Sequence, residues 1–191
     1  MEKTITLIRH GITPGNLEKR YIGITDEPLA TEGESEIQSR HYPDADIVFS
    51  SPLIRCKQTA SIIYPDHKIK VIHELRETNF GRFEGKNYLE LSEDSEYKDW
   101  IESGGEAAFP GGESRAEANK RIMEGFNKLL ILSKDCKNIS VIVHGGTIMG
   151  ILSQLFDGEY YSYHVENGEG YTFDLSSNGL YHGLRTRSFL R

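Results

Sequence analysis

The sequence predicts an α/β fold: a three-layer arrangement in which an open, mostly parallel sheet is flanked by helices. The first observation is the β-branched run at residues 4–9, whose apolar character on both faces is typical of a central strand covered by helices. The second is that similar short runs at 46–50 and 139–143 alternate with helical patterns. Parallel strands need such crossovers, so the alternation favours a parallel sheet.

Two helices in the first half are predicted from their starting signals. Thr31-Glu-Gly-Glu34 fits a capping box, so the acidic stretch that follows, to about residue 40, is predicted to be a surface helix. Ser51 and Pro52 are typical of a helix cap and a first-turn proline. Arg55 is therefore expected in the first turn of the second helix, near its positive end.

The second half is predicted to contain a long helix and a hairpin. A second capping box, Ser114-Arg-Ala-Glu117, precedes apolar residues at helical spacing. Residues 171–175 and 180–184 surround a segment rich in turn formers, which predicts two antiparallel strands. The remaining predicted elements are a short strand at 70–73 and a helix at about 147–156.

Residues 1–191 are expected to form one domain, with a cap-like insertion at about 84–112 over the site. The insertion is polar but carries several aromatic residues. These are interpreted as a small core rather than as platforms for substrate stacking. They are Tyr88, Tyr97, Trp100 and Phe109.

Composition excludes several classes of function. The formal net charge is −7, and the basic residues at 185–191 are too few to predict binding to nucleic acid. Cys56 and Cys136 form no Cys-x-x-Cys pair, which argues against a disulfide framework or a zinc ribbon and favours a reducing cytoplasmic location. No signal peptide is recognised, and the longest apolar runs are too short to span a membrane.

Two histidines follow predicted strands and are each followed by glycine. His10 ends the first strand within Arg9-His10-Gly11, and His144 follows the strand at 139–143. Open α/β sheets bind ligands at the carboxyl ends of their strands, so the two histidines are expected to share one site. Arg55 follows a third strand end. Histidines and arginines gathered in this way predict phosphate chemistry.

Five motifs, in order along nearly the whole chain, resemble those of the histidine phosphatase superfamily, also called the phosphoglycerate mutase-like family. They are Arg9-His10-Gly11-x-Thr13-x-x-Asn16, Ser50-Ser51-Pro52-Leu53-x-Arg55, Leu75-Arg76-Glu77, Pro110-Gly111-Gly112-Glu113-Ser114 and Val143-His144-Gly145-Gly146. The chain looks most similar to the small bacterial branch that contains α-ribazole phosphatase and broad-specificity phosphatases. One departure is Ile12, where many relatives carry a glutamate.

The resemblance implies a role for each matching residue and requires neither a metal nor a cofactor. His10 would be the nucleophile that forms a phosphohistidine, and Glu77 the proton donor, with Glu74 and Glu84 as nearby alternatives. Positive charge beside His10 would favour its neutral form. Gly145 would allow close approach of the backbone and offer its amide. The residues expected to bind the phosphoryl group are Arg9, Asn16, Arg55, His144 and Gly145.

The predicted function is therefore metal-independent hydrolysis of a small phosphorylated metabolite. Two alternatives stay open: a cofactor-dependent phosphoglycerate mutase, and a non-catalytic sensor of phosphate ligands on the same fold. Short length and the 110–114 element favour hydrolysis, and the acid Glu77 argues against a sensor. A metallophosphatase is disfavoured because arginines at the strand ends would repel a cation. The sequence does not predict the substrate or the oligomeric state.

Overall fold

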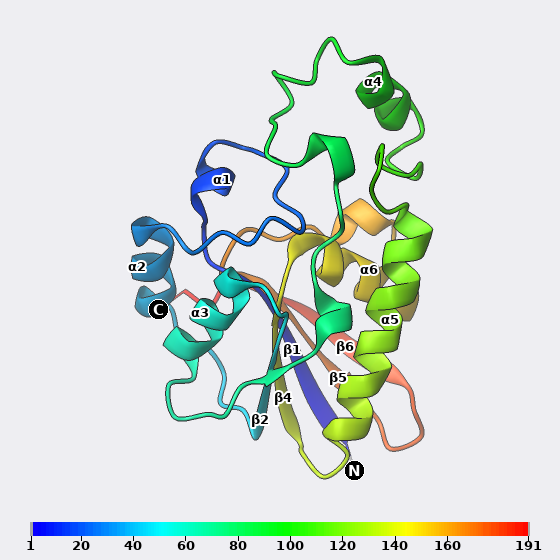
Figure 1. Cartoon of the computed structure of the whole chain (residues 1–191). Coiled ribbons are helices and arrows are strands. Elements are labelled where there is room, and N and C mark those ends of the chain that lie inside the picture. Colours follow the sequence, from blue (N-terminus) through cyan, green and yellow to red (C-terminus); the bar gives the residue numbers. More distant parts are fainter. Residues whose placement is uncertain (1, 191) are drawn as a thin grey trace.

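The sheet contains six strands within residues 2–190, the part of the chain that the computed structural model describes. The strands are β1 (Lys3–Arg9), β2 (Ile47–Ser50), β3 (Lys70–Val71), β4 (Asn138–Val143), β5 (Gly170–Leu175) and β6 (Tyr181–Arg187). Their order is β3-β2-β4-β1-β5-β6 (Figure 1). The first four strands pair in parallel and the last two antiparallel. The mostly parallel sheet and the hairpin are therefore confirmed.

Helices lie on both faces of this sheet, as the sequence predicts (Figure 1). The helices are α1 (Pro14–Leu17), α2 (Thr31–Ser39), α3 (Ile54–Ile63), α4 (Ser95–Glu102), α5 (Arg115–Leu132) and α6 (Gly145–Leu155). Leu7 packs in the core that α5 and α6 cover, whereas its neighbour Ile8 packs with α3 in a second core. Successive strand residues point to opposite faces, so a continuous apolar run places β1 between two helical layers.

Two of the predicted helix caps are wrong, although both helices exist. Ala30 is the N-cap of α2, so Thr31 lies inside the helix and makes no capping box. Helix α3 begins at Ile54, two residues beyond Pro52, and its first amide donates to Asp26 Oδ1 at 2.6 Å. The Ser51 hydroxyl instead contacts His144. At α3 a residue distant in sequence thus takes over the capping role, which no local pattern reveals.

The predicted cap at the start of α5 is confirmed. The Ser114 hydroxyl accepts a hydrogen bond from the Glu117 amide, and the Glu117 carboxylate accepts one from the Ser114 amide. Both orphan donors at this helix start are therefore satisfied by the capping box. No helix within residues 2–190 is both long and apolar enough to cross a membrane.

The segment 84–112 lies beyond the carboxyl ends of the parallel strands, where α4 is drawn in Figure 1. Tyr97 and Phe109 are buried with Phe83 and Leu91 in a separate small core, as predicted for the aromatic residues of this segment. Tyr88 is an exception, because half of its surface is exposed. The segment thus packs by means of its own aromatic side chains above the end of the sheet.

Candidate active site

The two strand ends that carry histidine meet, as the sequence predicts. Strands β1 and β4 pair in parallel, with Arg9 opposite Val143, so the residues after them emerge side by side. The ring centroids of His10 and His144 are 5.2 Å apart, with 64° between the ring planes. Parallel pairing therefore converts two separate sequence motifs into one cluster at the carboxyl edge of the sheet.

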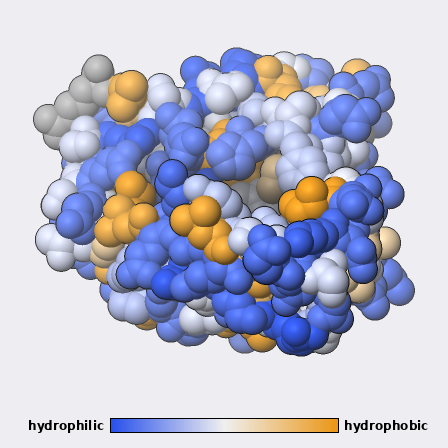
Figure 2. All heavy atoms as spheres, turned by 90° about the horizontal axis from the view of Figure 1, so that it is seen from above, coloured by the Kyte–Doolittle hydropathy of each residue, from blue (hydrophilic) through white to orange (hydrophobic). Residues whose placement is uncertain are grey.

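A cavity of about 180 Å³ lies at this edge. Five of the predicted site residues line it: Arg9, His10, Asn16, Glu77 and Gly145. Seen from above, the largely hydrophilic surface is hollowed near its middle, where hydrophobic side chains come into view (Figure 2). The volume and the polar residues fit a phosphoryl group with a small attached moiety.

His10 is held with one ring nitrogen engaged. Its Nδ1–H donates to the Gly11 carbonyl at 2.7 Å, which leaves the Nε2 lone pair for other chemistry. Burial, followed by the positive charges of Arg55 and Arg9, lowers the pKa of His10 well below 6.5. The imidazole is therefore neutral near pH 7, which is the form that can act as a nucleophile.

Arg9 and Arg55 each have a side-chain N–H donor that no acceptor among residues 2–190 satisfies. Arg9 Nη1 donates to the Val165 carbonyl at 2.7 Å, and the Arg55 guanidinium donates to the carbonyls of Gly23 and Thr25 at 2.7 and 2.8 Å. The Nε atoms of Arg9 and Arg55 are both buried without an acceptor among residues 2–190. Burial also lowers the pKa of Arg9. Buried donors without partners are costly, so an anion at this edge would relieve a standing penalty.

Asn16 is fixed by local and distant contacts. Its Oδ1 accepts hydrogen bonds from the Thr13 amide at 3.2 Å and from Asn167 Nδ2 at 3.1 Å. The first contact belongs to the capping box of α1. Asn167 Nδ2 also donates to the His10 carbonyl at 3.0 Å. With its oxygen engaged twice, Asn16 has its NH₂ group to offer to an oxyanion.

Arg55 and His144 are not among the residues that line this cavity. Both are completely buried. His144 Nε2 lies 2.7 Å from Ser51 Oγ, and Cys56 Sγ lies 3.5 Å from the same nitrogen. Burial, then nearby charges led by that of Arg55, lowers the pKa of His144 well below 6.5. His144 is thus a neutral ring whose orientation is set by Ser51.

Acidification is expected to destabilise the fold through the two buried histidines. The unfolded chain takes up protons near pH 6.5, but folded His10 and His144 do not, because burial lowers their pKa values. Each contributes a loss of about 1.4 kcal/mol in unfolding free energy per pH unit below that value, down to its folded pKa. Urea denaturation at several pH values measures this slope.

The variant His10→Gln isolates one histidine of the pair. Its slope should be shallower than that of the wild type, whereas replacing the exposed His41 should leave the slope as it is. An unchanged slope in His10→Gln would mean that His10 is protonated in the folded protein.

Glu77 is a buried carboxyl beside the nucleophile. Its Oε1 accepts from the Thr78 amide at 2.8 Å and its Oε2 from the Gly146 amide at 3.2 Å. Burial nevertheless raises the pKa of Glu77, because the desolvation effect exceeds that of the amides and of Arg55. Glu77 therefore keeps its proton to a higher pH than an ordinary glutamate, as a general acid requires.

Gly146, the residue after the predicted Gly145, lies against the Glu77 carboxyl. A Cβ at Gly146 would come within 2.5 Å of Glu77 Oε1, whereas a Cβ at Gly145 would meet the Arg9 side chain at an ordinary 3.5 Å or more. Helix α6 can therefore approach the Glu77 carboxyl because residue 146 has no side chain. Gly145 still lines the cavity.

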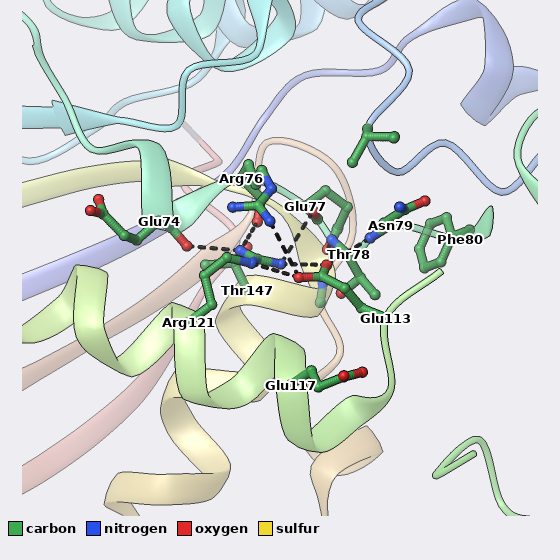
Figure 3. Close-up of polar contacts among 12 residues, drawn as sticks. Glu74, Arg76, Glu77, Thr78, Asn79, Phe80, Glu113, Glu117, Arg121 and Thr147 are labelled. Atoms are coloured by element: carbon green, nitrogen blue, oxygen red, sulfur yellow. Dashed lines mark hydrogen bonds and ion pairs between the residues drawn. The ribbon is translucent and has the colours of Figure 1, made fainter. Parts of the chain in front are cut away.

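Arg121 of α5 anchors the loop that carries Glu77 (Figure 3). Its guanidinium donates to the carbonyls of Glu74 and Arg76 at 2.8 and 2.9 Å. It also forms an ion pair with Glu113 at 2.7 Å. Although burial opposes the change, the hydrogen bonds from Arg121 and Asn79 lower the pKa of Glu113. One arginine thus holds the backbone before Glu77 to the long helix.

The two alternative carboxylates have other partners. Glu74 pairs with Lys128 at 3.2 Å on the surface of α5. Glu84 accepts hydrogen bonds from the amides of Ile24 and Phe80 at 2.9 and 3.0 Å. Neither lines the cavity that contains His10. The structure therefore places Glu77, and neither alternative, beside the nucleophile.

Three contributors to the site escape the sequence predictions. Ser51 is part of a quoted motif but is interpreted there as a helix cap, and Gly146 is overlooked in favour of its neighbour. Asn167 carries no recognisable signal. Within residues 2–190, no three histidine, cysteine, aspartate or glutamate side chains are grouped so as to hold a metal ion.

The family model of the histidine phosphatase superfamily (branch 1) matches residues 5–181. The chain belongs to this superfamily. The adenosylcobalamin/alpha-ribazole phosphatase of Escherichia coli K12 is 31% identical over 157 residues, which are 78% of this chain and 77% of the relative. A 2,3-bisphosphoglycerate-dependent phosphoglycerate mutase of Gloeobacter violaceus is 30% identical over 165 residues, covering 79% and 74%.

A solved structure of a putative alpha-ribazole-5'-P phosphatase from Escherichia coli shares the fold. It superposes with a TM-score of 0.87 at 25% identity, covering 98% of this chain and 97% of that one. These matches confirm the predicted resemblance. They identify the protein as an enzyme of the phosphatase and phosphoglycerate mutase group.

Proposed function

We propose that this enzyme is a metal-independent phosphomonoester hydrolase that acts on a small phosphorylated metabolite through a phosphohistidine at His10. The observation that carries the proposal is that one cavity contains both a neutral histidine with a free Nε2 and a buried carboxyl with a raised pKa. Phosphoryl transfer through histidine needs this pair, a nucleophile and an acid for the leaving oxygen. A sensor would not need the acid.

In the first step, His10 Nε2 attacks phosphorus while the bond to the leaving oxygen breaks. The proton of Glu77 passes to that oxygen, so the alcohol departs neutral and Glu77 becomes a carboxylate. In the second step, water attacks the phosphohistidine and gives its proton to Glu77. Inorganic phosphate leaves, and both residues return to their starting states.

We assign the phosphoryl oxygens to donors that surround His10. Arg9 and Arg55 supply positive charge, and each has a buried Nε without an acceptor among residues 2–190. Asn16 and the Gly145 amide offer neutral donors from the cavity wall. His144 Nε2 would have to exchange its contact with Ser51 Oγ for a phosphoryl oxygen in order to donate to that oxygen.

The ion pairs of Arg20 favour hydrolysis over the phosphoglycerate mutase reaction. A phosphoglycerate carries a carboxylate that needs a cation of its own. Arg20, the remaining cavity arginine, is paired with Glu18 at 2.6 Å and Glu90 at 2.7 Å, and these two carboxylates offset its charge.

Cys56 and Cys136 are both free, in keeping with an enzyme of the reducing cytoplasm.

Phosphate release after prolonged chelation tests the proposed function. We expect enzyme that has been incubated with a metal chelator to release inorganic phosphate from p-nitrophenyl phosphate, and from the phosphorylated metabolites that it hydrolyses, as fast as untreated enzyme does. Vanadate should inhibit, because it adopts the trigonal-bipyramidal geometry of the transition state. A loss of activity that a divalent metal restores would overturn the mechanism. Conversion of 3-phosphoglycerate to its 2-isomer without phosphate release would establish the mutase instead.

A further inference from the structure

A second cavity, of about 170 Å³, opens beside the first and differs from it in chemistry. Most of its walls are aromatic rings and aliphatic side chains from the 84–112 segment, from α5 and α6, and from residues 160–161. We call it the aromatic pocket. It is lined by Phe80, Trp100, Phe109, Ala118, Met149 and Tyr160, among others.

The aromatic pocket adjoins the cavity around His10. Tyr21, Phe80, Gly146 and Met149 line both. Gly146 is also the residue whose amide donates to the Glu77 carboxylate. The proton donor therefore lies at the junction of the two cavities. Because the leaving oxygen must sit beside this donor, the group attached to it is directed into the aromatic pocket.

The side chains that line the aromatic pocket favour an aromatic ring on the bound molecule and disfavour a second anionic group. The ring centroids of Trp100 and Phe109 are 4.8 Å apart. A third ring bound beside them could pack edge-to-face or offset-stacked, which are the favourable arrangements for aromatic pairs. Arg115 is the pocket's only lining residue with a cationic side chain within residues 2–190. Its guanidinium lies 4.6 Å from the centre of the Tyr160 ring and donates to the Gly104 carbonyl, so it is already engaged.

The size of the pocket agrees with this occupant. An apolar cavity of about 150 Å³ in another protein accommodates benzene, so the aromatic pocket has room for one planar ring.

We propose that the aromatic pocket binds a planar aromatic ring carried by the leaving group, so that the enzyme selects phosphomonoesters of ring-bearing alcohols over small acidic or aliphatic ones. The inference rests on the proposed function, since it names the substrate class of the same site. It also gives Trp100 and Phe109 a second role beside the core packing that the sequence predicts.

Binding can be tested without turnover. Trp100 is the single tryptophan, so fluorescence excited beyond the tyrosine absorption band reports on the aromatic pocket alone. 3-Phenylpropylphosphonate and propylphosphonate share a non-hydrolysable anion and differ only in the ring. The phenyl compound should change the Trp100 emission and bind about tenfold more tightly or better. Equal affinities with unchanged emission would overturn the proposal.

Kinetics supply a second test with matched leaving groups. 3-Phenylpropyl phosphate and propyl phosphate are both esters of primary alcohols, so the acid faces the same demand from each. Wild-type enzyme should favour the phenyl ester by about tenfold or more in kcat/KM. Ala118→Met, which fills the pocket, should abolish the preference, and Ala116→Met, at an exposed position of the same helix, should retain it.

The outcomes separate this proposal from the proposed function. Equal hydrolysis of both esters by the wild type would reject the ring-binding role and leave the hydrolase intact. Tighter binding of the phenyl phosphonate without phosphate release from either ester would reject the hydrolase and leave the pocket. If Ala118→Met fails to fold, the wild-type fluorescence titration still decides.

Discussion

Replacing His10 with alanine is expected to lower the rate of phosphate release by several orders of magnitude. The variant loses the ring nitrogen that attacks phosphorus, which His10 Nδ1 leaves free by donating to the Gly11 carbonyl. We expect a loss of roughly 5 kcal/mol or more of barrier reduction. Steady-state assays with p-nitrophenyl phosphate measure the effect.

The intermediate itself provides the decisive measurement. A rapid quench at alkaline pH should trap a covalent phosphoenzyme, because a phosphoramidate is stable to base and labile to acid. Intact mass and peptide mapping should place the label on His10. His164→Ala, which changes an exposed histidine of the same cavity, should still be labelled at His10. Label at any other residue would refute the nucleophile assignment.

The sheet is predictable from sequence because its signals are local. Strands β1 and β4 are each followed directly by a histidine, and parallel pairing follows from the helices between them. The capping box at Ser114 is equally local, since both partners lie within one turn. Element type and the meeting of His10 with His144 could thus be derived before any coordinates were known.

The predicted start of α3 is wrong for the opposite reason, because the partners involved are distant in sequence. Asp26 supplies the acceptor for α3 from 28 residues away, and Ser51 turns to His144, 93 residues further along the chain. Asn167 reaches the His10 carbonyl across 157 residues. Such partners are selected by the folded geometry, and a sequence pattern carries no record of them.

The sequence predicts which residues belong to the candidate site, but not which of them line the cavity and which are buried away from it. Arg55 and His144 are fully buried and do not line the cavity, while Arg9, His10 and Glu77 form its wall. Burial raises the pKa of Glu77, whose carboxylate contacts Gly146 from 69 residues further along the chain. A resemblance names the residues, whereas burial and orientation decide which of them a ligand meets first.

Glu77→Gln is expected to slow phosphorylation of His10 by alkyl phosphates by about a hundred- to ten-thousand-fold. Glutamine preserves the shape of the side chain but has no acidic proton for the leaving alkoxide. p-Nitrophenyl phosphate should be affected far less, because its phenolate departs without protonation. Arg55→Ala should harm both substrates similarly, because Arg55 acts on the phosphoryl group whatever leaves. Pre-steady-state bursts measure this step separately from hydrolysis of the phosphoenzyme.

The pH dependence gives the same assignment an independent check. Burial raises the pKa of Glu77, so the wild-type rate with alkyl phosphates should fall as pH rises through that value and the acid is lost. Glu77→Gln should remove this alkaline decline, whereas Glu74→Gln, which changes a glutamate paired with Lys128 outside the cavity, should preserve it. Equal slowing of the burst for alkyl and aryl phosphates in Glu77→Gln would show that Glu77 holds the phosphoryl group or the loop in place. The leaving oxygen would then have to take its proton from another source, and the mechanism proposed above would lose its acid.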